Sequence, residues 1–120
     1  MKRSRRGFDR TQRVADLIQK SLAQILQYGM IDDQFKVVTV VSVEVSRDLS
    51  YAKVYVSVLL DDEAKIKEMM TLLNRSAKAI RYELARAVDL RIVPELKFVY
   101  DESIAHGFRI SSLINSAIKK

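Results

Sequence analysis

Apolar side chains recur every three or four positions over the N-terminal part of the chain, which is the spacing of an amphipathic helix. We predict that this helix begins at Asp9, because Asp9 and Gln12 have the spacing of a reciprocal N-terminal cap. Gly29 is a natural stop for it. The apolar stripe consists of Val14, Leu17, Ile18, Leu22, Ile25 and Leu26.

The period of the pattern then changes from 3.6 to 2, which indicates strands. One expected strand covers residues 39–46, with Thr39, Val41, Val43 and Val45 on one face. A second covers residues 51–60, with Ala52, Val54, Val56, Val58 and Leu60 on one face. Since turn-forming residues 47–50 separate them, we predict an antiparallel hairpin.

A second helical pattern starts after the acidic residues 61–63 and continues to Val88. It is longer than the usual globular helix of ~8 to 20 residues, so we expect a break within it. Leu96, Phe98 and Tyr100 then alternate as a third strand, and residues 103–120 have the pattern of a short helical tail. The order predicts one α+β domain over residues 1–120, with a three-stranded sheet covered on one face by helices.

Positive charge is concentrated at the N-terminus. The chain has a formal net charge of +6, and residues 2–13 hold six basic side chains against one acid. We expect residues 1–8 to form a mobile basic arm because they contain few apolar groups. Its arginines favour a phosphate-bearing partner, since the guanidinium meets phosphate with two hydrogen bonds. The basic residues that we assign to this contact are Arg3, Arg5, Arg6, Arg10 and Arg13.

A second basic group lies on the long helical pattern. A helical wheel places Arg75, Lys78, Tyr82 and Arg86 on one face, opposite the apolar stripe. Arg81 flanks this face and Arg91 follows the helix. Basic side chains neutralise phosphates, and a tyrosine among them can stack on a base. An ordinary solvated face is the alternative, but together with the arm the pattern favours nucleic-acid binding.

Residue types that perform much of enzyme chemistry are scarce. There is no Cys and a single His, His106, so thiolate metal sites and a Cys-based triad are excluded. We expect no catalytic residue, no metal and no other cofactor. No apolar run is long enough to span a membrane and no secretory signal is present, so we expect a soluble, cytoplasmic protein without membrane contact.

Two segments carry a family resemblance. Residues 46–56, SRDLSYAKVYV, and residues 90–101, LRIVPELKFVYD, resemble ribosome-binding factor A of bacteria. Residues 12–15 and 110–113 agree with the same family. The resemblance implies a type II KH fold with the order α-β-β-α-α-β. In place of the family's kinked Ala-x-Gly between two helices, this chain has Ser76-Ala77-Lys78, which adds a charge where RNA could approach.

The resemblance also implies a function. Family members bind the free 30S subunit late in assembly, contact 16S ribosomal RNA, support 5′-end maturation of its precursor and matter most in the cold. We accordingly expect a monomeric, non-enzymatic RNA-binding protein, and an assembly GTPase is left open as a further partner. Two alternatives remain: a general KH-type module for single-stranded RNA or DNA, and a small hydrolase built around His106.

Overall fold

The computed structural model describes residues 2–102, with side chains described from Arg10 onward. The elements along the chain are α1 (Lys2–Gln27), the 3-10 helix η1 (Asp33–Val37), β1 (Val38–Val45), β2 (Tyr51–Val58), α2 (Glu63–Arg75), α3 (Ala77–Ala87) and β3 (Glu95–Tyr100). Apart from η1, this is the expected α-β-β-α-α-β order, so the α+β prediction is confirmed. The helical tail expected at 103–120 lies outside the described residues.

Helix α1 begins earlier than the sequence led us to expect. Its backbone is helical from Lys2, so the helix start assigned to Asp9 is wrong. Gln12, the expected capping partner, instead donates a hydrogen bond to Asp16 Oδ1 at 2.8 Å, one turn further along. Arg and Lys are good helix formers, and a single interior Gly such as Gly7 costs only about 1 kcal/mol relative to Ala, so the basic segment can continue the helix.

The connection after α1 requires glycine at position 29, as the sequence predicted. Gly29 has a φ of +63°, and an added Cβ would lie 2.6 Å from Asp33 Oδ1. Asp32 then caps η1 by accepting a hydrogen bond from the Gln34 backbone N–H at 3.0 Å. This capped turn was not foreseen from the sequence, and it brings Phe35 into the core with 0% exposure.

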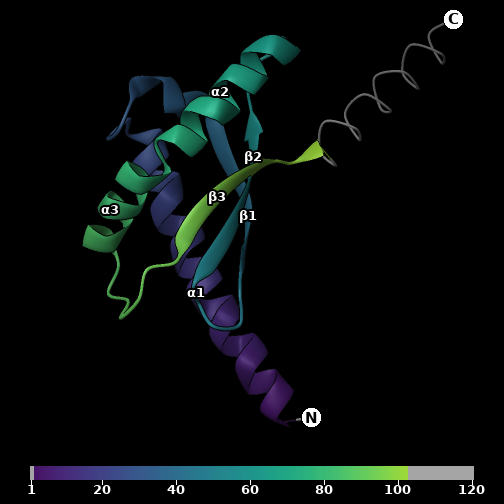
Figure 1. Cartoon of the computed structure of the whole chain (residues 1–120), viewed down its shortest axis with the longest axis vertical. Helices are drawn as coiled ribbons and strands as arrows, with labels where there is room; N and C mark the ends of the chain where they lie inside the picture. The colour runs from purple at the N-terminus through teal and green to yellow at the C-terminus, as the bar shows by residue number, and fades with distance from the viewer. Residues whose placement is uncertain (1, 103–120) are drawn as a thin grey trace, which may run out of the picture.

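The three strands form one sheet in the order β1-β2-β3. Strand β1 is antiparallel to β2, and β3 returns parallel to β2 after the chain has crossed through α2 and α3 (Figure 1). The buried face of β2 is the expected one, with Ala52, Val54, Val56 and Val58 all buried. β2 is therefore the central strand, and β1 and β3 are the edges.

Strand β1 contains a bulge that simple alternation does not predict. Val41 is the extra residue at which the register with β2 shifts. Val40 before it and Val43 after it are both buried although they are three positions apart, so the single face expected from Thr39 to Val45 is wrong. The Val41 carbonyl accepts a hydrogen bond from Gln19 Nε2 of α1 at 3.1 Å, which satisfies a backbone group outside the regular ladder.

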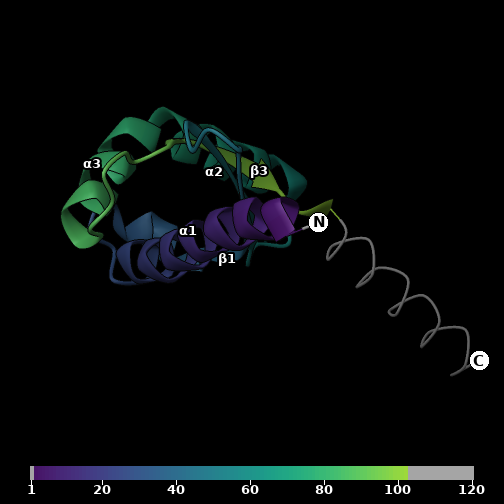
Figure 2. The same ribbon diagram turned by 90° about the horizontal axis from the view of Figure 1, so that it is seen from below.

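The helices form one layer over one face of the sheet (Figures 1 and 2). Helix α1 packs on β1, helices α2 and α3 pack on β3, and α1 also contacts α3. Apolar side chains from both layers form a buried cluster that includes Ile18, Leu22 and Val54, each 0% exposed. Leu17, assigned to the apolar stripe, is instead 38% exposed. Within residues 2–102, no helix is long and apolar enough to cross a membrane.

The long helical region divides at Ser76, as the expected break requires. Ser76 has φ −90° and ψ 3°. Its N–H is shared between the carbonyls of Leu72 and Leu73 at 2.9 and 3.1 Å, and its own carbonyl accepts from the Ile80 N–H at 2.9 Å. The backbone hydrogen bonding of α2 and of α3 is therefore maintained up to the kink from both sides. Lys78, which stands where the family has glycine, lies inside α3 with no positive φ.

The β1–β2 turn is held by its own side chains. Asp48 accepts hydrogen bonds from Ser50 Oγ at 2.7 Å, Ser46 Oγ at 2.8 Å and the Ser50 N–H at 3.1 Å. Ser46 Oγ in turn accepts from the Tyr51 N–H at 3.0 Å. The bonds from Ser50 and Ser46 lower the pKa of the Asp48 carboxyl from 3.8 to about 2. Leu49 takes a left-handed conformation with φ 62° within this network.

We expect the Asp48 charge to stabilise the fold at neutral pH and to lose this effect in acid. Because its pKa is lowered in the folded protein, the stabilisation is present above pH 3.8 and is lost as the pH falls through about 2. Asp48→Asn keeps an acceptor oxygen without the charge, so it should lower the melting temperature slightly at neutral pH. Thermal melts followed by circular dichroism test this. A difference from wild type that stays constant down to pH 2 would contradict it.

Candidate nucleic-acid interface

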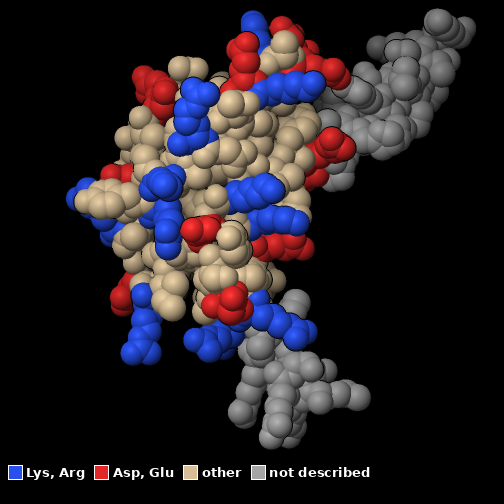
Figure 3. Space-filling model, in the orientation of Figure 1, with Lys and Arg blue, Asp and Glu red and all other residues tan. Residues whose placement is uncertain are grey.

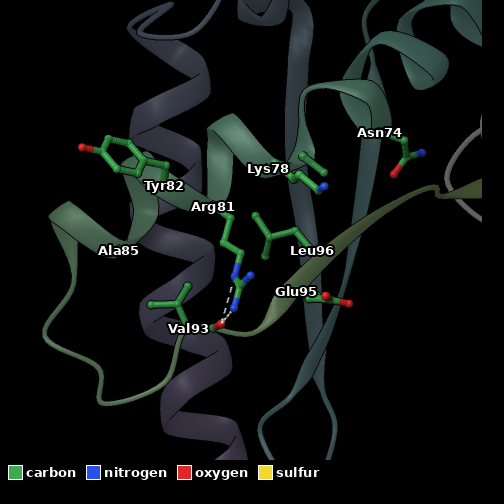
Figure 4. A pocket seen from close by; sticks show the side chains of 9 residues that line it. Asn74, Lys78, Arg81, Tyr82, Ala85, Val93, Glu95 and Leu96 are labelled. Atoms are coloured by element: carbon green, nitrogen blue, oxygen red, sulfur yellow. Dashed lines mark hydrogen bonds between the residues drawn. The ribbon is translucent and has the colours of Figure 1, made fainter.

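An open hollow of about 600 Å³ lies between helix α3 and the edge strand β3 (Figure 4). Lys78, Arg81 and Tyr82 border it from α3, and Val93, Glu95 and Leu96 border it from the β3 side. Two basic side chains and an aromatic ring thus surround a partly apolar depression. Such a set can contact both phosphate and base, although Glu95 places one acid at the β3 side.

Arg81 forms hydrogen bonds with the backbone at the border of this hollow. Its Nε and Nη2 atoms both donate to the Val93 carbonyl oxygen, at 3.1 and 2.8 Å (Figure 4). The guanidinium therefore ties α3 to the segment that leads into β3. The phosphate contact assigned to Arg81 from the sequence stays a prediction, and the structure adds a positioning role.

Asn74, at the end of α2, binds the backbone of β3 on its free edge. Asn74 Oδ1 accepts from the Phe98 N–H at 2.9 Å, and Nδ2 donates to the Phe98 carbonyl at 3.0 Å. The same Nδ2 lies 3.2 Å from the Met70 carbonyl of its own helix. This side chain pairs with Phe98 as a neighbouring strand would, so it anchors the α2–α3 kink to the sheet.

The kink separates residues that the helical wheel had placed together. The wheel assumed one continuous helix, but Arg75 lies before the break at Ser76 and the other three residues lie after it. Arg75 lines a different hollow of about 770 Å³, together with Lys65 and Lys67. The predicted face is therefore divided into an α3 group and an α2 group.

The remaining residues of the second basic group are exposed. Tyr82 is 65% exposed, Arg86 is exposed and lies 3.7 Å from Glu83, and Arg91 is exposed in the segment before β3. Figure 3 views the side of the molecule that carries α2, α3 and β3, and Lys and Arg side chains are spread over it with Asp and Glu side chains between them and at the borders. The basic side chains on this side are therefore scattered and do not form one compact patch.

The first basic group lies elsewhere on the molecule. Arg10 and Arg13 are exposed on α1, whose N-terminal turns extend beyond the β1–β2 turn (Figure 1). Neither residue lines the hollow beside α3. The side chains of Arg3, Arg5 and Arg6 lie outside the described residues. The structure therefore does not bring the two basic groups together at one hollow.

Some residues of this surface were missed by sequence reasoning. Asn74 was not singled out, although Asn is unfavourable inside a helix because its side chain bonds nearby backbone, and it stands two residues before the break. Lys65 and Lys67 fall on the α2 side of the kink, which sequence periodicity could not locate. Both omissions follow from not knowing where the helix breaks.

Nothing in residues 2–102 groups three or more potential metal ligands of the His, Cys, Asp or Glu type. His106, on which the hydrolase alternative depends, lies outside the described residues. In that part of the chain the perturbed pKa values belong to the exposed Asp48, described above, and to the partly exposed Tyr55, whose pKa is raised by its hydrogen bond to Glu44. These two carboxylates bond neighbouring side chains in the β1–β2 turn and across the sheet.

Comparison with known proteins identifies relatives over nearly the whole chain. The family described as ribosome-binding factor A matches residues 10–114. Ribosome-binding factor A of Shewanella sediminis is 46% identical over 113 residues, covering 94% of this chain and 79% of that protein. The protein of the same name from Shewanella loihica is 43% identical over 115 residues, covering 96% of this chain and 82% of that protein.

Solved structures agree with the sequence relatives. The crystal structure of ribosome-binding factor A from Thermus thermophilus superposes with a TM-score of 0.64 at 26% identity, covering 75% of this chain and 94% of that one. A putative ribosome-binding factor A from Thermotoga maritima gives 0.63 at 35% identity, covering 75% and 85%. A Thermus thermophilus homology model fitted into a cryo-EM map of a 30S complex gives 0.58 at 28% identity, covering 72% and 89%. With a matching family profile, close sequence relatives and the same fold, the chain belongs to the ribosome-binding factor A family.

Proposed function

We propose that this protein is a non-catalytic assembly factor that binds the free 30S subunit late in its assembly. It contacts 16S ribosomal RNA, supports maturation of the 5′ end of the precursor and is most important in the cold. The observation that carries the proposal is the similarity to the Thermus protein fitted into a 30S complex, together with membership of the same family.

The surface geometry supports RNA as the direct contact. Lys78 and Tyr82 border the hollow beside α3 and are exposed, so they can reach a phosphate and a base. Around them, the proposed phosphate contacts are the exposed basic residues of both groups: Arg10, Arg13, Arg75, Arg86 and Arg91, with Arg3, Arg5 and Arg6 of the N-terminal segment and Arg81 at the rim. Polar and charged contacts of this kind suit a folded RNA surface rather than a small-molecule pocket.

The proposal also defines the partners. The protein acts as a monomer in the cytoplasm, where bacterial subunits are assembled, and it needs no metal or other cofactor for RNA contact. An assembly GTPase would be a partner in release, because a factor that binds an immature subunit must leave before the subunit enters translation. The proposed activity is therefore binding and release, without a chemical step.

Co-sedimentation tests the proposal. We expect the full chain to travel with free 30S subunits on a sucrose gradient and to be absent from intact 70S ribosomes. Unlabelled single-stranded RNA of unrelated sequence should compete poorly with the subunits. Equal affinity for unrelated RNA and for mature subunits would instead support a general KH-type RNA-binding module, and absence from the 30S fraction would contradict the proposal.

A further inference from the structure

The face of the sheet opposite the helices, here called the open face, is not covered by any of the described helices. Helices α1, α2 and α3 all pack on the other face, together with the buried side chains of β2. The side chains that alternate with these along β2 therefore point to the open face. Leu59 continues the alternation just beyond β2, since its N–H bonds the Val37 carbonyl at 2.9 Å, and it is 84% exposed.

Apolar side chains cross the open face from one edge strand to the other. Val99 of β3 is the register partner of Tyr55 of β2, and Tyr55 is the partner of Ser42 of β1. The bulge also turns Val41 to this side, because the residues before and after the pair 41–42 are both buried on the helical side. Val41, Tyr55 and Val99 are each partly exposed. These three side chains form an apolar row that no described element covers.

The segment that follows β3 has a sequence pattern that matches this row. Ile110, Leu113, Ile114 and Ala117 recur at steps of three and four, which predicts an amphipathic helix with one apolar stripe. A helix over residues 108–118 has a length of about 17 Å, and the eight residues of β2 span about 26 Å, so such a helix fits along the sheet. Residues 103–120 lie outside the described residues.

This segment starts at the end of the sheet that carries Leu59. Strand β3 is parallel to β2, and Tyr100 at its end pairs with Val56 near the end of β2. The ladder continues to the Asp101 N–H, which bonds the Val56 carbonyl at 2.9 Å. A link over residues 102–107 reaches up to about 20 Å when extended. The segment can therefore fold back over the open face while β3 stays paired.

The charges on the open face and in the segment have opposite signs. The open face has three acids and two lysines, namely Glu44, Glu95, Asp101, Lys53 and Lys97. Residues 103–120 contain no acid and three basic side chains, namely Arg109, Lys119 and Lys120. Since acids outnumber lysines on the face, its charge favours a cationic segment over a polyanion.

We propose that residues 108–118 form a helix that packs on the open face, with its apolar stripe against the apolar row. Packing removes both apolar surfaces from water, which drives the contact. The sheet is then covered by helices on both faces. The inference goes beyond the proposed function and does not depend on it, because the contact forms within the free protein and needs no RNA.

Introduced cysteine pairs test the contact in the full chain, which has no Cys of its own. Lys53 is exposed on the open face, and Ala117 lies on the apolar stripe of the segment. In a glutathione redox buffer, we expect Lys53→Cys with Ala117→Cys to form a disulfide within one chain about ten-fold faster than the control pair, because packing raises the effective concentration. The control pair is Lys20→Cys with Ala117→Cys, since Lys20 is exposed on α1 in the helical layer. Non-reducing gels separate the linked monomer from a linked dimer.

Charged substitutions in the segment provide a second measurement. Ile110→Asp with Ile114→Asp places two acids in the apolar stripe, so it should lower the melting temperature by about 4 °C or more and slow the disulfide of the Lys53–Ala117 pair. The matched control is Ser111→Asp with Asn115→Asp, which adds the same charge on the polar side of the helical pattern. The control should melt as wild type. Circular dichroism measures both melts.

Three results would overturn the inference. Equal disulfide rates in the two cysteine pairs would show that the segment does not lie on the open face. A disulfide-linked dimer in place of the linked monomer would assign the face to the segment of a second copy. Equal melting temperatures for the two charged variants would show that the apolar stripe is not packed. None of these measurements involves the ribosome, whereas the proposed function falls by the absence of the protein from the 30S fraction.

Discussion

Reversing the charge at Arg75, Lys78 and Arg86 together is expected to weaken binding to free 30S subunits at least ten-fold, which corresponds to about 1.4 kcal/mol. The three side chains are exposed on α2 and α3, so each substitution replaces attraction to phosphate by repulsion. The fold should be unaffected, because the ion pair that is lost, Arg86–Glu83, has a 3.7 Å separation and a 68% exposed arginine side chain. A sedimentation titration at constant salt measures the change.

The single variants show which side of the kink contacts the RNA. Lys78 borders the hollow beside α3, whereas Arg75 lines the other hollow, so Lys78→Glu should weaken binding more than Arg75→Glu. Lys20→Glu is the matched control, because Lys20 is exposed on α1 and borders neither hollow. Wild-type affinity in the triple variant would show that the helices α2 and α3 do not carry the contact.

Replacing Asn74 by Ala is expected to lower the free energy of unfolding by about 2 kcal/mol, since both backbone groups of Phe98 lose their partner. Asn74 bonds the Phe98 N–H at 2.9 Å and the Phe98 carbonyl at 3.0 Å, on an edge of the sheet with no further strand among the described residues. Urea unfolding followed by circular dichroism measures this change. The same variant should also weaken RNA binding, because Asn74 borders the hollow beside α3.

Two further variants distinguish the loss of the Asn74–Phe98 hydrogen bonds from the loss of a hydrogen bond within α2. Asn74→Asp keeps an acceptor for the Phe98 N–H but loses the donor to the Phe98 carbonyl, so its loss of stability should be intermediate. Thr71→Ala removes a hydrogen bond within α2, from Thr71 Oγ1 to the Lys67 carbonyl at 3.0 Å, and should have a small effect. If Asn74→Ala is no more destabilising than Thr71→Ala, the side chain does not hold β3.

The helices and strands were predictable because their apolar periodicity reflects burial on one face. The stripe from Val14 to Leu26 marked α1, and the alternation from Ala52 to Val58 marked the buried face of β2. Residue types also marked the ends: Gly29 adopts the positive φ that stops α1, and Asp62 caps α2 by accepting from the Ala64 N–H at 2.9 Å. These signals depend on near neighbours in the chain.

The errors occurred where the outcome depends on distant partners. The bulge at Val41 is stabilised by Gln19 of α1, a residue 22 positions away, so alternation within β1 could not reveal it. The start of α1 was also mispredicted. The capping pattern at Asp9 indicated a helix start there, whereas the helix begins at Lys2. The kink at Ser76 divides the basic helix face. The sequence predicted a break in this region but not its position, so the division could not be predicted.

By itself, the sequence determined the order of elements, the concentration of positive charge and the family to which the chain is similar, because periodicity, composition and motifs are local properties. The tertiary structure decided which of those charges lie together. In the folded chain, Arg81 donates hydrogen bonds to the Val93 carbonyl, and Arg75 and Lys78 line different hollows. Lys53 and Lys97 are neighbours on the open face of the sheet. Such neighbours are set by chain crossings and strand register, which bring together residues far apart in sequence.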